Sequence, residues 1–94
     1  MAVIGVLTLE LRLENSHSLK DKRNVVESLK HRLRNKFNVS VAEIDGQGLW
    51  QRATVAAVTV SSSHEFAEKV LRSAENEAAS LLGGELADAT VEWL

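Results

Sequence analysis

The 94-residue sequence contains no cysteine, which excludes disulfides, thiolate metal sites and thiol nucleophiles. This absence suits a reducing compartment, so we expect a cytoplasmic protein. Proline is absent too, so glycine, asparagine and serine must mark the ends of helices and strands. The longest uncharged apolar-rich stretch, residues 53–60, is far too short to span a bilayer, and we expect no membrane partner.

The Lys and Arg residues are concentrated in one segment. Residues 12–36 carry eight of them against three acidic residues, a local balance of +5. Residues 37–94 carry three against nine, a balance of −6, and Glu10 brings the chain to its net charge of −2. A concentrated basic segment favours an anionic partner, most simply the backbone of a nucleic acid.

Hydrophobic periodicity predicts six elements in a single domain spanning residues 1–94. A period of two predicts strands over residues 3–13, 39–44, 50–60 and 87–93. Ser18 is expected to cap a first helix, whose apolar face is made by Leu19, Val25, Val26, Leu29, Leu33 and Phe37. A Ser62–Glu65 capping box is expected to open a second helix that Gly83 and Gly84 end. The buried side of the second helix is predicted to be Phe66, Val70, Leu71, Ala74, Ala78 and Leu81.

The resulting order, β-α-β-β-α-β, predicts an α+β fold, the ferredoxin-like sandwich. In it a four-stranded antiparallel sheet carries two helices on one face, and the two most apolar strands, residues 3–13 and 50–60, lie in the centre. Following the chain through this topology brings the connections at residues 14–18, 45–49 and 83–85 to one end of the sheet. We therefore expect the functional site at that end.

Three segments carry a family resemblance. SHSLKDKR at residues 16–23, RNKFNVSVAE at 34–43 and LWQRA at 49–53 resemble the hallmarks of the bacterial YlxP-like family, and the match spans nearly the full chain. The resemblance implies a small cytoplasmic ferredoxin-like protein without established catalytic residues. Members of the family are often encoded among translation and ribosome-maturation factors, so it also implies association with RNA or the ribosome.

The candidate nucleic-acid site is a basic stripe along one side of the first helix. Its residues are Arg23, Lys30 and Arg34, with Lys20 and His31 adjoining. Such a stripe neutralises phosphates and gives salt-dependent binding. The alternative is a solvated face on which Glu27 bridges Arg23 and His31.

The turn before the first helix is a candidate anion pocket. Backbone N–H groups at residues 16–18, with Lys20 and Arg23 nearby, suit a phosphate or sulfate. The alternative is simple capping by Ser18, with His17 exposed.

Lys22 falls within the apolar sector of the first helix, so its stem should run along the core edge toward Glu43 or Asp45. These two carboxylates stand two apart on a strand and should share a face, where ion pairing is a commoner role than acid–base chemistry. Trp50 and Arg52 are expected at the same end, and Arg52 joins the candidate anion-binding residues. A lone Trp at a strand start could stack a base, but packing is its usual role.

Motifs for catalysis and cofactors are missing. The phosphate loop of acylphosphatase, which shares this fold, is absent, as are a Walker loop and a G-x-G-x-x-G segment. His17, His31 and His64 lack a metal-ligand spacing. We therefore expect no enzymatic activity, no cofactor and no metal. Since the central strands lack aromatic residues for stacking bases, bound RNA should be held mainly through its phosphates.

The sheet face turned away from the helices is expected to carry Ile4, Val6 and Thr8, with Val55, Ala57 and Thr59 as possible neighbours. An uncovered apolar patch on one sheet face commonly marks an interface, which predicts a homodimer. The leading hypothesis is a non-catalytic RNA- or ribosome-associated accessory protein. The alternative is a homodimeric module that binds a small anion or a protein partner.

Overall fold

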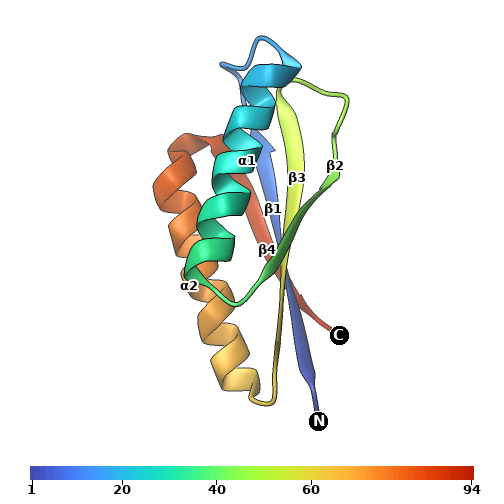
Figure 1. Ribbon diagram of the computed structural model, residues 1–94, viewed down its shortest axis with the longest axis vertical. Helices are drawn as coiled ribbons and strands as arrows, with labels where there is room; N and C mark the ends of the chain where they lie inside the picture. Colours follow the sequence, from blue (N-terminus) through green and yellow to red (C-terminus); the bar gives the residue numbers. More distant parts are fainter.

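A computed structural model describes residues 1–94 and confirms the predicted ferredoxin-like architecture (Figure 1). The elements are β1 (Val3–Arg12), α1 (Leu19–Lys36), β2 (Ser40–Asp45), β3 (Arg52–Ser61), α2 (His64–Leu82), the 3-10 turn η1 (Gly83–Glu85) and β4 (Leu86–Trp93). The strands pair antiparallel in the order β2-β3-β1-β4, and both helices cover the same face of the sheet. Neither helix combines the length and apolarity needed to cross a membrane.

Both helices begin at serine caps. Ser18 Oγ accepts a hydrogen bond from the Asp21 backbone N at 3.1 Å, which confirms the predicted start of α1. The prediction for α2 is wrong by one residue, because Ser63 Oγ accepts from the Phe66 backbone N at 3.1 Å and Ser62 is not the cap. Consecutive serines offer equivalent caps, and β3 continues as far as Ser61, which places the helix start later.

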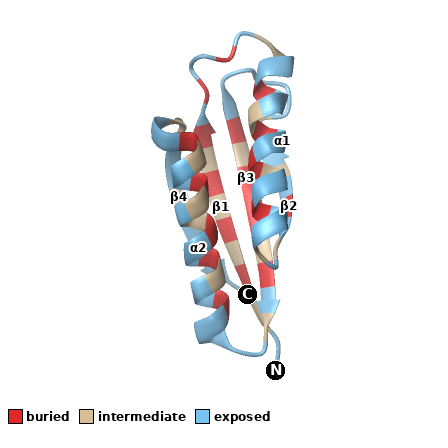
Figure 2. Cartoon of the chain, turned by 60° about the vertical axis from the view of Figure 1, so that its left-hand side comes forward, coloured by how far each residue is buried: buried red, intermediate tan, exposed pale blue.

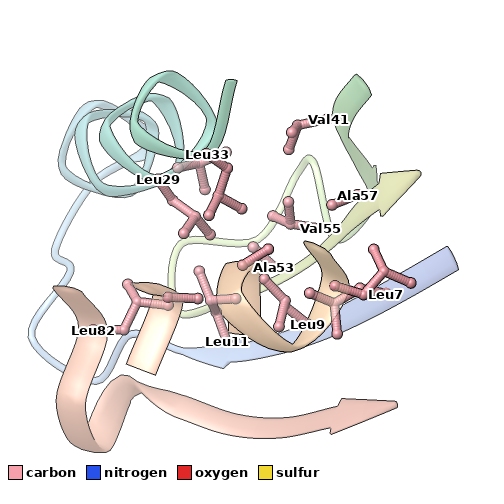
Figure 3. Packing of buried hydrophobic residues seen from close by; sticks show 14 of the residues in the cluster. Leu7, Leu9, Leu11, Leu29, Leu33, Val41, Ala53, Val55, Ala57 and Leu82 are labelled. Atoms are coloured by element: carbon pink, nitrogen blue, oxygen red, sulfur yellow. The ribbon is translucent and has the colours of Figure 1, made fainter. Parts of the chain in front are cut away.

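The core lies between the sheet and the helices, where 15 buried residues form one continuous cluster. Odd-numbered residues of β1 point toward the helices, as the period of two predicted, and Leu7 and Leu9 are fully buried. Figure 3 shows Leu7 and Leu9 in the same cluster as Leu29 and Leu33 of α1, with Ala53 and Val55 of β3 lying between the two pairs in this view. Figure 2 shows the same alternation of buried and less buried residues along β1 and β3.

The predicted buried side of α2 is partly wrong. Phe66 is 59% exposed, and the next residue, Ala67, is buried instead. The fully packed positions of α2 are Ala67, Leu71, Ala74, Ala78 and Leu82. Three of these are alanines, whose small side chains let the helix backbone lie close to the sheet, where a phenylalanine would hold it away.

The predicted outer face of the sheet also needs correction. Val55, Ala57 and Thr59 are buried beneath the helices and do not lie on that face. Antiparallel register sets Val6 opposite Val58, so the even-numbered residues of β3 share the outer face with those of β1. The apolar residues of the outer face are Ile4, Val6, Ala42, Ala56, Val58 and Val60, and Thr8 lies among them.

Candidate nucleic-acid interface

The β1–α1 turn, the β2–β3 connection and η1 lie toward the same end of the sheet, as predicted (Figure 1). Gln51 joins the first two, since its Nε2 donates to the carbonyls of Glu14 at 3.2 Å and Ser16 at 3.3 Å. The backbone N of Leu13 donates in turn to the Gln51 carbonyl at 2.9 Å. Sequence reasoning missed Gln51, because its partners lie 35 and 37 residues away and no local pattern marks them.

Lys22 is the buried charge of the molecule, with 1% of its surface exposed. Its Nζ lies 2.8 Å from Glu43 Oε2 and also donates to the carbonyl of Gly46, so the predicted ion pair with Glu43 is confirmed. Glu43 Oε2 is buried and accepts no hydrogen bond. The ammonium of Lys22 is therefore the group that compensates the negative charge of Glu43. The pair therefore ties α1 to β2 and to the turn that follows β2.

Asp45 does not share a face with Glu43, contrary to the prediction. A bulge between them shifts the register, so that Glu43 stands opposite Val55 and Asp45 opposite Thr54. Asp45 is exposed, and its Oδ1 accepts from the backbone N of Gly46 at 2.8 Å. Lys22 consequently has a single carboxylate partner.

A hollow of about 740 Å³ opens on the outer face at this end of the sheet. Its charged lining residues are Glu10, Arg12, Glu14, Asp45, Arg52 and Asp88. Arg12 and Arg52 stand opposite each other on β1 and β3, surrounded by four carboxylates. Arg52 lies on the face of the sheet opposite α1, and the excess of negative charge around it disfavours the anion-binding role predicted for it.

The predicted anion pocket at residues 16–18 is occupied by the chain's own carboxylate. The backbone N of His17 donates to Asp21 Oδ2 at 3.0 Å. Ser18 caps the helix and His17 is exposed, which is the simpler of the two arrangements considered above. Because Asp21 lies where a phosphate would bind, the turn offers no vacant anion site.

Two cations of α1 face α2, where Arg32 and Lys36 share the carboxylate of Glu77 at 3.2 and 3.1 Å. The hydrogen bond from Lys36 lowers the pKa of Glu77 below its usual value, burial of the carboxyl opposes this shift, and Arg32 adds to the lowering. The Arg32 and Lys36 side chains remain 44% and 55% exposed. One carboxylate for two exposed cations leaves a surplus positive charge on this side of the helix.

Arg23, Lys30 and Arg34 recur at intervals of seven and four residues, which places them on one side of α1. Arg34 Nη2 donates to the carbonyl of Val41 at 3.1 Å, so this side lies above the edge strand β2. We call these three residues the β2-side stripe. The Arg34 contact fixes the orientation of the stripe. It uses only Nη2 of the guanidinium, so the other nitrogens of Arg34 make no hydrogen bond to the fold.

Glu27 does not bridge Arg23 and His31 as the alternative for this face assumed. It contacts Lys30 at 3.3 Å, an exposed pair of small energetic value. Lys20 and Arg23 are exposed and make no ion pair. Outside the core, α1 thus presents six cations against the carboxylates of Asp21, Glu27 and Glu77, a surplus of three positive charges.

Comparison with known proteins decides the family. Residues 4–91 match the family described as "Protein of unknown function (DUF503)". The chain is also 41% identical over 70 residues to the "Uncharacterized protein YlxP" of Bacillus subtilis (strain 168). The aligned region covers 74% of this chain and 76% of that protein. The chain belongs to this family.

The three segments that carry the YlxP-like resemblance converge at the site. Lys22 lies in the first, Glu43 in the second and Gln51 in the third. Lys22 pairs with Glu43, and Gln51 bonds to the carbonyl of Ser16, which opens the first segment. These three segments of the chain therefore build one structural assembly at the end of the sheet.

Solved structures with the same fold share little sequence with this chain. The de novo designed protein Foldit4 superposes with a TM-score of 0.61 at 12% identity, covering 100% of this chain and 97% of that one. A putative antibiotic biosynthesis monooxygenase from Bordetella bronchiseptica gives 0.57 at 16% identity, covering 100% and 96%. A dimeric ferredoxin-like protein of unknown function from Thermobifida fusca gives 0.51 at 14% identity, covering 97% and 90%. Such identities show a common fold alone.

Proposed function

We propose that this protein is a non-catalytic cytoplasmic accessory factor that binds structured RNA or the ribosome through phosphates. The β2-side stripe and the neighbouring Lys20 form the binding surface. The observation that carries the proposal is the surplus of three positive charges over the whole exposed surface of α1 in a chain of net charge −2; the proposed surface itself holds four of the cations against Asp21 and Glu27. A one-sided field of this kind orients the molecule toward a polyanion before contact.

The geometry of the stripe supports contact with several phosphates. Arg23 and Arg34 lie eleven residues apart, about 16 Å along the helix axis. The outer face of the sheet is unsuited to the same ligand, because its hollow carries four carboxylates. RNA bound along α1 would be held mainly by its backbone, with affinity that falls steeply as salt rises.

Reversing the charge of Arg23 is expected to lower RNA affinity about tenfold near 0.1 M salt and to reduce the slope of log affinity against log salt by about one. Arg23 is the sharpest probe because it is exposed and has no partner within the fold. Affinities of Arg23→Glu for an RNA hairpin and for ribosomal subunits are measured across a salt series. Arg34→Glu serves as a second probe, with its folding checked because Arg34 also bonds to Val41.

The matched control is Arg72→Glu, which makes the same charge change on α2, where Arg72 is 68% exposed. Equal losses for Arg23→Glu and Arg72→Glu would show that net charge alone matters and would contradict a site on α1. Absence of any RNA affinity at low salt would reject the proposed function.

A second candidate function, a homodimeric module, is favoured by the outer face of the sheet. No helix covers this face, and Val60 there is 56% exposed. Four strands about 4.8 Å apart, the longest about 33 Å, span roughly 600 Å², somewhat less than the ~800 Å² per partner of a standard interface. The charged hollow occupies one end of the face, so we expect a weak dimer centred on Val6 and Val58.

Val58→Lys is expected to weaken self-association at least tenfold, because it places a charge at the centre of the apolar patch. Light scattering over a concentration series from micromolar to about 0.5 mM measures the effect. Phe66→Lys is the control, since Phe66 is equally apolar and 59% exposed but lies on α2. A wild-type chain that stays monomeric throughout would rule out this candidate.

A further inference from the structure

The β2–β3 connection carries two large apolar side chains in solvent. Trp50 is 52% exposed and Leu49 is 50% exposed. The expectation that a lone Trp at a strand start packs against the fold is therefore wrong here. The reason is that β3 begins at Arg52, so Trp50 precedes the strand and lies in the connection.

This connection is held firmly at its base. Lys22 and Gln51 anchor it to the start of α1 and to the β1–α1 turn, as described above. Within it, the backbone N of Leu49 donates to the Gly46 carbonyl at 2.9 Å, and Gln47 Nε2 donates to the Glu43 carbonyl at 3.2 Å. Gly46 has a φ of 83°, and an added Cβ would lie 3.0 Å from the Arg52 carbonyl, so only glycine fits this turn without strain.

The exposed indole of Trp50, carried on an anchored loop, is well placed to stack on a flat ligand. A loop that is ordered before binding loses little conformational entropy when it binds. Residues 48–52 line an open hollow of about 570 Å³, and Leu49 and Trp50 are its two hydrophobic residues. Nucleobases stack on aromatic side chains, and this contact tolerates any base because every base has a π-face.

The start of α1, and not the carboxylate-lined hollow on the outer face, supplies the positive charge for a base attached to phosphates. The connection lies at the same end of the molecule as the start of α1, where Lys20 and Arg23 are exposed and unpaired (Figure 1). A single-stranded segment that crosses this end can place a phosphate near α1 and turn a base toward Trp50. A fully paired duplex keeps its bases stacked inside and cannot do so.

We infer that Trp50 stacks an unpaired base of the RNA whose phosphates contact Lys20 and Arg23 at the start of α1. This inference rests on the proposed function and narrows it to RNA with a loop, bulge or single-stranded end. Lys22 and Gln51 act as positioning residues, since they hold the connection that carries Trp50.

The test uses a Trp93→Phe background, so that Trp50 is the only tryptophan. An RNA hairpin with an unpaired loop is compared with a blunt duplex of the same stem sequence. The looped RNA is expected to quench Trp50 fluorescence and the duplex to leave it unchanged. Trp50→Ala is expected to lower affinity for the looped RNA by tenfold or more without changing affinity for the duplex, and Trp50→Phe to retain most of the affinity.

Three outcomes overturn the inference. If Trp50→Ala binds the looped RNA as tightly as its parent while Arg23→Glu loses affinity, stacking is refuted and the proposed function stands. If neither RNA binds, both fail together. If Trp50 emission shifts to the blue as protein concentration rises without RNA, the indole belongs to a contact between copies of the chain.

Discussion

Replacing Lys22 with methionine is expected to lower the free energy of unfolding by about 3 kcal/mol. Methionine matches the length of the stem but removes the ammonium that lies 2.8 Å from Glu43 Oε2. The carboxylate then stays in a half-buried position, 18% exposed, without a compensating charge, and the Gly46 carbonyl loses its donor. Urea unfolding followed by circular dichroism measures the change.

Two comparisons separate this effect from a general loss of charge. Lys30→Met removes a cation from the exposed pair with Glu27 and is expected to cost less than about 1 kcal/mol. The double variant Lys22→Met/Glu43→Leu is expected to recover most of the lost stability, because a buried ion pair can be replaced by apolar side chains at little cost. A Lys22→Met variant as stable as Lys30→Met would contradict the buried pair.

Leu9→Ala is expected to lower the free energy of unfolding by about 3 kcal/mol. Leu9 is fully buried in the centre of β1, opposite Val55 of β3 and Ala89 of β4. Truncation leaves a cavity between the sheet and the helices that neighbouring strands cannot fill without breaking their register. The same urea experiment gives the value.

The adjacent residue provides the control for Leu9→Ala. Thr8 belongs to the same strand but points to the outer face, so Thr8→Ala should change stability by less than about 0.5 kcal/mol. Both variants are measured at low micromolar concentration, where self-association contributes least. Similar losses at both positions would mean that the two faces of β1 are equally buried, against the alternation that organises the fold.

The fold was predictable because each element carries its own periodicity. Alternation along β1 and the helical spacing of Val26, Leu29 and Leu33 identify their elements without reference to the rest of the chain. Right-handed crossovers then restrict β-α-β-β-α-β to one common arrangement. The predictions at Ser62 and Phe66 are each wrong by one residue along the chain. Local sequence pattern locates helix boundaries and buried positions only to within about one or two residues.

A residue of the site could be predicted from sequence where its chemistry conflicts with the pattern of its neighbours, as a charged residue does on the apolar side of a helix. Lys22 interrupts the apolar sector of α1, and this conflict alone indicated a buried ion pair with a residue such as Glu43. Gln51 and Glu77 show no such conflict, because a glutamine before a strand and a glutamate on a helix are ordinary. Their roles follow only from partners more than 30 residues away.

The order of elements, the inward face of β1 and the concentration of positive charge in residues 12–36 follow from the chain's local pattern, because these properties depend on residues close together in the sequence. Tertiary structure decided which of those cations remain available. It assigned Lys22 to the core and gave Arg32 and Lys36 a shared carboxylate on α2, while Arg23 stayed free. Local pattern could not give these assignments, because ion pairing, strand register and exposure depend on which remote segments meet when the sheet and helices pack.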